Sequence, residues 1–271
     1  MIEKGNEEVG KTVLYEQNGK VGIITLNRPE VVNAVNEQMQ VELTEVLTEV
    51  KNNENLRAVV LTGAGPGFCA GGDIKGMLAN FAKTPADQRA ILMENLVHNW
   101  LTLLINLEKP VISAVHGYAV GAGLSIALAT DIIIAARSTI FSMAFAQVGL
   151  LPDLSGLFFM ARALGVHRAK ELIFTADRFS AEKAYELGLV NRVVDDDLYL
   201  DEAMNLAQRL AEGPTRAYGY AKKLLHLAPS LDLNTFFEYE RLYQSLVAET
   251  EDYREGVNAF IEKRPPKFKG R

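Results

Sequence analysis

One stretch of the chain combines two kinds of residue that could do chemistry, a glycine turn and an isolated carboxylate. The turn is Gly121-Ala122-Gly123, which follows the β-rich run 111–120 and precedes the small apolar run 124–130. This order predicts a strand, a tight turn and a buried helix whose first backbone N–H groups have no partner within the helix. Small residues let a ligand oxygen approach those groups, and the helix dipole favours negative charge there. The turn therefore predicts a site for an anion or an oxyanion.

The carboxylate is Asp153, which follows Pro152 among apolar residues and is a candidate acid or base. Each feature also has a purely structural interpretation. The turn could be a packing device of an α/β protein, and Asp153 could cap a helix that begins near Ser155. A dinucleotide-binding fingerprint does not fit, because Ile126 stands where its third glycine is needed. The combination of the two features in one stretch favours a functional site.

A second glycine-rich loop lies earlier in the chain, from Gly63 to Asp73. Six of its eleven residues are Gly or Pro, and it lacks the Lys-Ser/Thr ending of a P-loop. A simple turn seldom needs that many, so the backbone of this loop is predicted to be shaped for a ligand. The loop contains the single cysteine, Cys69, which is better interpreted as a small buried apolar residue than as a nucleophile.

The elements that must position these loops alternate between strands and helices. A hairpin is predicted at residues 12–26, where Asn18-Gly19 separates two β-rich runs. Asn36 is predicted to cap a helix that extends to about Asn52. Further strands are expected at 56–62, 131–136 and 189–194, helices at 86–107, 155–164, 168–174 and 180–188, and a mobile connection at 74–85.

The last part of the chain has a different character. From about Leu200 onwards only helical patterns occur, at residues 201–212, 215–227, 233–248 and 252–263. We therefore predict an α/β core at residues 1–198 and a helical region at residues 199–271. The broad apolar and aromatic faces of the tail helices predict that this region joins subunits together.

The composition narrows the class of protein. The chain has 271 residues, of which 48% are hydrophobic, and no apolar run of about 18 residues, which predicts a globular protein without a membrane span. Its net charge of −6 argues against nucleic acid or an anionic membrane as the main partner. The single cysteine and the polar start of the sequence predict a reducing, cytoplasmic location. The run Asp195-Asp196-Asp197 is expected to be a solvated loop, because no ligand spacing or histidine supports a metal site there.

Five segments together resemble the enoyl-CoA hydratase/isomerase, or crotonase, family. They are LNRPEVVNAVN at 26–36, GFCAGGDI at 67–74, KPVISAVHGYAVGAGLSIALATDIIIA at 109–135, SAEKAYELGLVNRVV at 180–194 and YREGVNAFIEKRPPKF at 253–268. The resemblance covers nearly the whole chain. It implies an α/β fold built as a spiral of ββα repeats, followed by helices that form homotrimers, usually paired into hexamers.

The resemblance also implies roles for particular residues. The backbone N–H groups of Gly72 and Ala122 would form an oxyanion hole for the thioester carbonyl of an acyl-CoA substrate. Contacts with CoA are implied within the subunit for Val31, Asn33, Ala70, Asp73, Ile74 and Lys75, and in the neighbouring subunit for Phe260 and Lys263. On general grounds the two lysines could equally be solvated surface charges. No metal or separate cofactor is implied, because CoA enters as part of the substrate.

Two departures from the family pattern decide which chemistry is expected. The positions of the two glutamates of classical hydratases are Ser125 and Phe145. Adding water needs one group to activate it and another to deliver a proton, and neither side chain titrates near neutral pH. A lone carboxylate at Asp153 instead suits an isomerase, in which one base removes a proton and returns it two carbons away. The segment GLLPDLSG at 149–156 resembles the corresponding loop of the family's phenylacetate-pathway epoxide isomerases.

Other reactions of the family stay as alternatives. A dehalogenase would use Asp153 as its nucleophile, but its tryptophan position is Phe145 here and its base would have to be His98. Hydration, thioester decarboxylation and thioester hydrolysis use the same oxyanion hole. A different class is a non-catalytic acyl-CoA-binding subunit, which the loss of both glutamates fits and the presence of Asp153 opposes.

Overall fold

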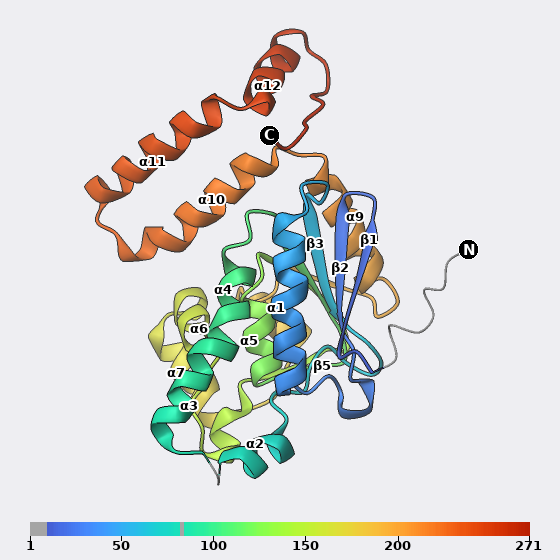
Figure 1. Cartoon of the computed structure of the whole chain (residues 1–271), viewed down its shortest axis with the longest axis vertical. Coiled ribbons are helices and arrows are strands. Elements are labelled where there is room, and N and C mark those ends of the chain that lie inside the picture. Colours follow the sequence, from blue (N-terminus) through green and yellow to red (C-terminus); the bar gives the residue numbers. More distant parts are fainter. Residues whose placement is uncertain (1–9, 82–83) are drawn as a thin grey trace.

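An α/β core carries an arm of C-terminal helices that extends away from it (Figure 1). The computed structural model describes residues 10–81 and 84–271, and the side chains of all of these except 79–81. The first residues of the chain, on which the prediction of location partly depended, lie outside the described part. The predicted mixed α/β class is confirmed.

The core begins with the predicted hairpin. Strands β1 (Val13–Asn18) and β2 (Val21–Leu26) are antiparallel, with Asn18 paired to Val21 at the turn. Gly19 in that turn has φ +60°, which glycine adopts without strain. The Asn18-Gly19 signal therefore identified the hairpin correctly.

In the described part of the chain, six strands form the main sheet in the order β1-β2-β3-β4-β6-β9. After the hairpin, neighbouring strands are parallel; they are β3 (Ala58–Gly63), β4 (Val111–Val115), β6 (Ile132–Ala136) and β9 (Arg192–Val194). Side chains alternate along β3, so that Val60 packs with helix α9 (Tyr199–Ala211) and Leu61 packs on the side of α1 (Glu37–Asn52). Burial on both faces explains why these strands are almost continuously apolar.

After β4, and again after β6, the chain leaves the main sheet and adds a strand to a second sheet. The chain turns at Gly117 (φ +58°) between β4 and β5 (Tyr118–Val120), and β6 is likewise followed by β7 (Ile140–Ser142). Strands β5, β7 and β8 (Phe179–Ser180) form a second sheet, which the single bridges Val35–Gly72 and Cys69–Ala119 extend. Helix α5 (Ala122–Leu128) follows β5, and α6 (Gly156–Leu164) follows β7. This is the expected spiral of ββα repeats.

Both ends of α1 are held by side chains. Asn36 caps the start, because its Oδ1 accepts a hydrogen bond from the Met39 N–H at 2.9 Å, as predicted. At the other end, the buried ammonium of Lys109 donates to the carbonyls of Val50 (2.5 Å) and Asn53 (2.7 Å). Lys109 precedes β4, so this contact fixes α1 against the sheet.

The segment between the two glycine-rich loops departs from the prediction in two places. Residues 74–81 form a helix, α2 (Ile74–Phe81), where a mobile connection was expected, because Asp73 caps it by accepting from the Gly76 N–H at 3.1 Å. The long helix predicted at 86–107 is present as α3 (Ala86–Leu92) and α4 (Asn99–Ile105). A π-helical turn, η2 (Met93–His98), joins them.

The tail helices lie close to their predicted positions. They are α9, α10 (Thr215–Leu227), α11 (Leu233–Ala248) and α12 (Glu251–Ile261). Helix α9 packs on the sheet, and the arm begins with α10 (Figure 1). The division at residue 198 itself stays a prediction. The remaining helical segments are η1 (Pro29–Val31), η3 (Ala144–Val148), α7 (Val166–Thr175), α8 (Ala181–Glu186) and η4 (Ala228–Ser230).

The last residues of the chain, 265–271, return from the tip of the arm to the core and are called the C-terminal strap below. The buried guanidinium of Arg57 donates to the carbonyl of Phe268 (2.8 Å), the carbonyl of Gly213 and the hydroxyl of Thr215 (2.9 Å). The buried carboxylate of Asp252 accepts from the Lys269 N–H at 2.6 Å and from the Gly270 N–H. These bonds tie the arm to the edge of the core.

The aspartate run at 195–197 has a structural role. Asp195 pairs with Arg137 at 3.2 Å, and Asp196 accepts from the Ser138 N–H at 2.8 Å, so the run holds the turn between β6 and β7. Among the residues that the structure describes, no group of three or more His, Cys, Asp or Glu side chains could hold a metal ion. Within the same residues, no helix is long and apolar enough to cross a membrane.

Candidate active site

The Gly72 amide is turned away from its neighbouring strand. Gly72 forms a parallel bridge with Val35, in which the Val35 N–H donates to the Gly71 carbonyl (2.8 Å) and the Asp73 N–H donates to the Val35 carbonyl (2.9 Å). Because residues alternate along a strand, the Gly72 N–H points to the opposite side. Over the described residues, no acceptor lies within hydrogen-bonding distance of this amide.

The Ala122 amide is left free by the geometry of the glycine turn. Gly121 has φ +53° and donates its N–H to the Ser142 carbonyl at 2.8 Å, so that Ala122 becomes the first residue of α5. The first N–H groups of a helix have no intrahelical acceptor, and no other acceptor meets the Ala122 N–H in the described part of the chain. The predicted strand, tight turn and buried helix are thus confirmed.

The two glycine-rich loops meet backbone to backbone. A Cβ atom on Gly71 would lie 3.9 Å from the amide nitrogen of Ala122, and one on Gly121 would lie 3.9 Å from the Cα of Gly71. Gly123 is packed still more tightly, because a Cβ there would collide with the Cys69 carbonyl. This close approach brings the two free amides together, and it explains why both loops need glycine. Two converging N–H groups are the geometry that an oxyanion hole requires.

Ser125 and Phe145, which stand where the resemblance implies the glutamates of classical hydratases, are both buried. Ser125 is fully buried in α5 and lies directly against Gly156, where an added Cβ would overlap its hydroxyl. The ring of Phe145 is 8% exposed and comes within 3.7 Å of a Cβ position on Gly121. Phe145 thus forms an apolar floor beside the glycine turn, and neither position has a group that titrates near neutral pH.

Asp153 lies in a tight turn between Phe145 and α6. The next two residues, Leu154 (φ 50°) and Ser155 (φ 61°), both adopt the left-handed conformation, and the Gly156 N–H donates to the Asp153 carbonyl at 2.9 Å. No side chain caps α6, so the interpretation of Asp153 as a helix cap does not hold. Strained non-glycine residues of this kind concentrate at functional sites.

The Asp153 carboxylate is poised to take up a proton. Its Oδ1 is buried and has no hydrogen-bond partner within the described structure. Burial raises the pKa of this carboxyl from 3.8 to about 6, and this outweighs its own backbone N–H and the charge of His98, which both lower the pKa. A carboxylate with such a pKa can act as a general base or acid near neutral pH.

The loops around the site are held together by Asn33 and Arg28. The buried Asn33 side chain donates to the carbonyls of Ala64 and Gly67, both at 2.8 Å, and accepts from the Arg28 N–H at 2.7 Å. The Arg28 guanidinium donates to Asp73 at 3.1 Å, and with the Gly76 N–H it lowers the pKa of Asp73. The side chains of Asn33 and Asp73 are thus occupied in positioning the loops. Arg28 was missed by sequence reasoning, since no local pattern reveals a partner 45 residues away.

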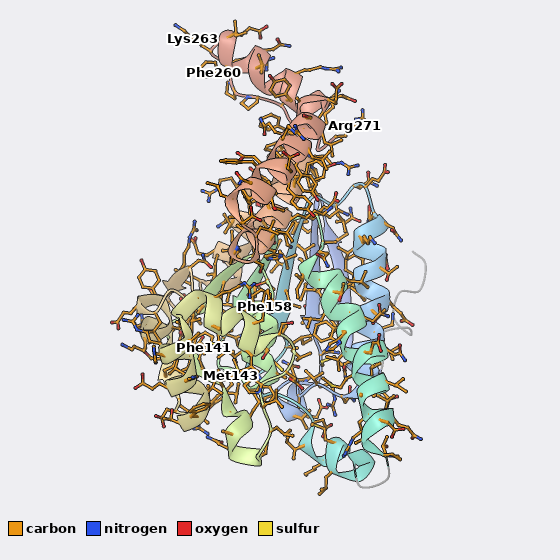
Figure 2. The ribbon with its side chains drawn as sticks, turned by 90° about the vertical axis from the view of Figure 1, so that its left-hand side faces the viewer. Phe141, Met143, Phe158, Phe260, Lys263 and Arg271 are labelled. Atoms are coloured by element: carbon orange, nitrogen blue, oxygen red, sulfur yellow. The ribbon has the colours of Figure 1, made fainter. Side chains whose placement is uncertain are left out.

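The other residues expected to contact CoA fall into two groups. One group is exposed and lies in or next to the loop from Gly63 to Asp73; its members are Val31, Ala70, Ile74 and Lys75. Phe260, which is 86% exposed, and Lys263 lie instead at the tip of the arm (Figure 2). In Figure 2 they are far from Met143, which lies in the core beside Ser125. Within one chain, these two residues are not brought to the site.

Cys69 takes no part as a nucleophile. Its side chain is fully buried, and burial raises the pKa of the thiol to about 12. The thiolate is the reactive form of cysteine, and it is therefore not formed at neutral pH. Cys69 acts as the small buried residue that the sequence predicts.

The comparison with protein families identifies the family of the chain. Residues 16–271 match the family model described as enoyl-CoA hydratase/isomerase. The chain belongs to the enoyl-CoA hydratase/isomerase family. The family named from the sequence segments is confirmed, and the chain is a member of a family of enzymes.

Individual members of the enoyl-CoA hydratase/isomerase family carry both kinds of name. The chain is 43% identical to the 1,2-epoxyphenylacetyl-CoA isomerase of Escherichia coli (strain K12), over 92% of this chain and 94% of that protein. It is 38% identical to a probable enoyl-CoA hydratase of Rhodobacter capsulatus, over 96% of this chain and 98% of that protein. The crystal structure of an enoyl-CoA hydratase from Polaromonas sp. JS666 superposes with a TM-score of 0.89 at 36% identity, covering 94% of this chain and 98% of the other.

Membership of the enoyl-CoA hydratase/isomerase family leaves the reaction to be argued from the site. The two free amides suit any reaction that develops charge on a thioester oxygen. The features of the site that bear on the reaction are the half-buried carboxylate of Asp153 and the residues Ser125 and Phe145, which stand where the resemblance implies the glutamates of classical hydratases.

Proposed function

We propose that the chain is an acyl-CoA isomerase in which Asp153 is the only acid/base group. The observation that carries this proposal is a carboxylate with an unpartnered oxygen, Asp153, on the turn that ends at Gly156. Gly156 packs against Ser125 of α5, the helix that begins at the free Ala122 amide. An isomerase needs one base, whereas a hydratase needs two groups to handle water. Asp153 also opposes a purely binding role, since keeping an unpaired buried oxygen costs stability.

The mechanism follows from the charges that develop. The thioester carbonyl of a 3-enoyl-CoA accepts hydrogen bonds from the Gly72 and Ala122 N–H groups. Asp153 removes a proton from C2, and the C–H electron pair moves into the π-system to form a dienolate. The protonated Asp153 then returns the proton to C4, and the double bond moves into conjugation with the thioester. Each preorganised donor contributes roughly 2.7–4 kcal/mol in comparable oxyanion holes.

The apolar floor supports this chemistry in two ways. Phe145 and Leu154 are buried, and they exclude the water that would otherwise add to the conjugated product. They also keep the carboxylate poorly solvated, which makes it a stronger base. The name of the 43% identical relative supports a ring epoxide of phenylacetyl-CoA as one substrate of the same oxyanion hole.

Binding of the CoA part is proposed for the exposed loop residues. Val31, Ala70, Ile74 and Lys75 are accessible to the adenine and pantetheine, while Asn33 and Asp73 shape the loops. No metal or additional cofactor is proposed. A cytoplasmic location also stays a proposal.

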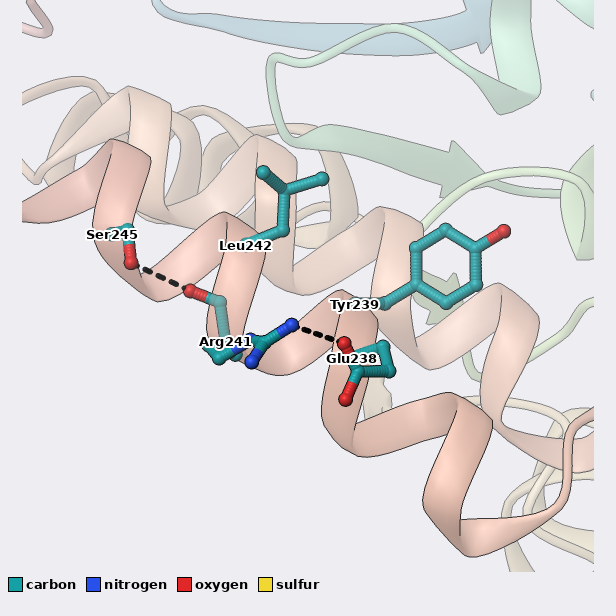
Figure 3. A pocket seen from close by; sticks show the side chains of 5 residues that line it. All are labelled: Glu238, Tyr239, Arg241, Leu242 and Ser245. Atoms are coloured by element: carbon teal, nitrogen blue, oxygen red, sulfur yellow. Dashed lines mark hydrogen bonds and ion pairs between the residues drawn. The ribbon is translucent and has the colours of Figure 1, made fainter.

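Assembly into a homotrimer, or a dimer of trimers, is proposed from the arm. Helix α11 has no buried residue. Its side chains Leu242 and Tyr239 instead line a hollow of about 480 Å³ (Figure 3). Large apolar side chains left exposed over a whole helix indicate a surface that another chain covers. In such an assembly, Phe260 and Lys263 at the arm tip would reach the CoA of a neighbouring subunit.

The experiment is a comparison of a 3-enoyl-CoA with a 2-enoyl-CoA, followed by the absorbance of the conjugated thioester. We expect the absorbance to rise with the 3-enoyl substrate and to change little with the 2-enoyl substrate. Asp153→Asn should lower kcat by about 10²–10⁴-fold, because it keeps the shape but removes the base. Asp177→Asn, at an exposed aspartate outside the site, is the matched control.

Three results would oppose the proposal. Near-full turnover by Asp153→Asn would remove Asp153 from the mechanism. A rapid fall of the 2-enoyl signal would show hydration and require another acid pair. Stabilisation by CoA without turnover of any enoyl-CoA or ring-epoxide thioester would favour the non-catalytic binding subunit.

A further inference from the structure

The proposed isomerase places a strict demand on the position of Asp153. Its carboxylate must reach both C2 and C4 of a substrate whose carbonyl is held by the Gly72 and Ala122 amides. A displacement of about 1 Å in such an arrangement can lower a rate by about 10²-fold. A contact that fixes Asp153 relative to these amides is therefore needed, and the role inferred below for that contact rests on the proposed function.

A tight turn fixes the backbone of Asp153 to Gly156. Leu154 (φ 50°) and Ser155 (φ 61°) both adopt the left-handed conformation, and the Gly156 N–H donates to the Asp153 carbonyl at 2.9 Å. Leu154 is also buried, so the turn is anchored in the core. A shift of Gly156, the first residue of α6, must therefore shift Asp153 as well.

Gly156 in turn packs against Ser125. It is buried, and a Cβ atom on it would overlap the Ser125 hydroxyl. Its backbone does not require glycine, because Gly156 has no positive φ and alanine is the better helix former. The reason for glycine at this position is therefore the space that the Ser125 side chain fills.

Ser125 is fixed to the Ala122 amide through α5. Both residues lie in the first turn of this helix, and the Ser125 N–H donates to the Gly121 carbonyl at 3.1 Å. The Ser125 side chain is fully buried, and its hydroxyl donates to the Met143 sulfur at 3.9 Å. A continuous packed path thus leads from the Ala122 amide through Ser125 to the turn that carries Asp153.

We propose that Ser125 is a positioning residue, which holds Asp153 at a fixed distance from the Ala122 amide through its contact with Gly156. In this role the hydroxyl exchanges no proton with the substrate. Its contribution is its size, because it fills the space between α5 and the turn. The position where the resemblance implies a hydratase glutamate then serves to place the base rather than to provide one.

The test exchanges the two groups that are in contact. Gly156→Ala should push the turn away from α5 and lower kcat for a 3-enoyl-CoA by about 10²-fold. Ser125→Ala should lower kcat by less, because it leaves a gap into which the turn can move. In the double variant, the methyl group added at position 156 takes the place of the missing hydroxyl, 3.4 Å from the Cβ of position 125 and from the Met143 Cε. The double variant should therefore be more active than either single variant.

Two further measurements separate positioning from a general loss of structure. The acid limb of kcat/KM should move from about pH 6 towards the ordinary aspartate range in Gly156→Ala, since a displaced carboxyl is better solvated, and it should return in the double variant. Ser113→Ala removes another fully buried hydroxyl, from β4. Combined with Gly156→Ala, it should give no recovery of kcat, because it makes no room beside Gly156.

The outcomes separate this role from the proposed reaction. Near-full activity of Gly156→Ala would overturn the positioning role and leave the isomerase intact. A double variant no more active than Ser125→Ala would also overturn it, and this comparison decides the matter even where Gly156→Ala alone does not fold. A slow Gly156→Ala whose acid limb stays at about pH 6 would overturn it too. Absence of isomerisation in the unaltered chain would overturn the proposed function itself, and the role of Ser125 with it.

Discussion

At the scale of single residues, the buried oxygen of Asp153 links activity to stability. The environment that raises the pKa of this carboxyl to about 6 makes it a useful base, and it also makes the ionised form costly in the folded chain. Two measurable consequences follow, one for the rate and one for the free energy of unfolding. Ionisation of Asp153 is needed for the reaction, whereas it lowers the free energy of unfolding.

The first consequence concerns the pH dependence of the rate. The base must be ionised in order to remove a proton, so activity is lost as the pH falls through the pKa of Asp153. We expect kcat/KM for a 3-enoyl-CoA to decline below a pH of about 6, with a limiting slope of about tenfold per pH unit. Rates measured from about pH 3.5 to about pH 8 in overlapping buffers would test this, because the range extends roughly two pH units either side of the expected midpoint. A limb near pH 4, the ordinary aspartate value, would contradict the assigned environment.

The second consequence concerns the stability of an inactive variant. An acid whose pKa is raised on folding holds its proton more tightly in the folded chain, so its contribution to the stability falls as the pH rises from about 4 to about 6. Asp153→Asn removes this cost, and we expect it to be more stable than the unaltered chain at pH 7.5, by at most about 3 kcal/mol. At pH 4 the difference should shrink. Denaturant unfolding at both pH values measures it, and equal differences would contradict the expected burial.

At the scale of elements, the site depends on two loops that touch along their backbones. Gly123 in the first turn of α5 packs against the Cys69 carbonyl of the other loop. We expect Gly123→Ala to push the loops apart and to lower kcat by about 10²-fold or more, since misplaced donors no longer meet the oxyanion. Steady-state kinetics with a 3-enoyl-CoA would measure this loss.

The matched control for that substitution is Gly76→Ala in α2. A Cβ there meets Asp73 only at ordinary contact distances of 3.6 Å and above. This variant should keep most of its activity, because it adds the same methyl group without displacing a loop. Equal losses in both variants would indicate a general effect of the substitutions and would argue against loop contact as the cause.

Some elements could be predicted from the sequence because their causes are local. Asn36 caps α1, Asn18-Gly19 forms the hairpin turn, and the tail helices follow their apolar periodicity. Helix α2 was missed because it is short, although its Asp73 cap is also a local signal. The π-turn η2 has no recognisable local signal, since the apolar pattern of residues 86–107 fits a single helix.

The site could be predicted only in part, for a similar reason. The turn at Gly121 and the carboxylate of Asp153 are visible in the sequence, but their meeting depends on the spiral of strands. That Ser125 and Phe145 stand at the glutamate positions of classical hydratases could be inferred only from the resemblance to the family. The Asn33 side chain donates hydrogen bonds to Ala64 and Gly67, which lie more than 30 positions further along the chain, and spacing along the chain does not reveal these contacts.

At the scale of the whole molecule, the arm leaves large apolar side chains exposed in a single chain. We expect Leu242→Glu, at a residue 53% exposed on α11, to shift the chain from an oligomer towards a monomer, because a charge would be buried in the interface. Gln244→Glu adds the same charge on the same helix and serves as the control. Sedimentation velocity would measure both, and an unchanged oligomer in Leu242→Glu would exclude this face of α11.

The C-terminal strap has a consequence for how the protein is made. Arg57 emerges early from the ribosome, but the partners of its guanidinium, which are Gly213, Thr215 and Phe268, are synthesised at least 156 residues later. At about 5–20 residues per second, the first partner lags Arg57 by many seconds, and Phe268 follows later still. A charged group cannot stay in this buried place without acceptors. This edge of the core must therefore close last, after translation has delivered the strap, and a ribosome stalled before Phe268 would hold a nascent chain whose core is still open at Arg57.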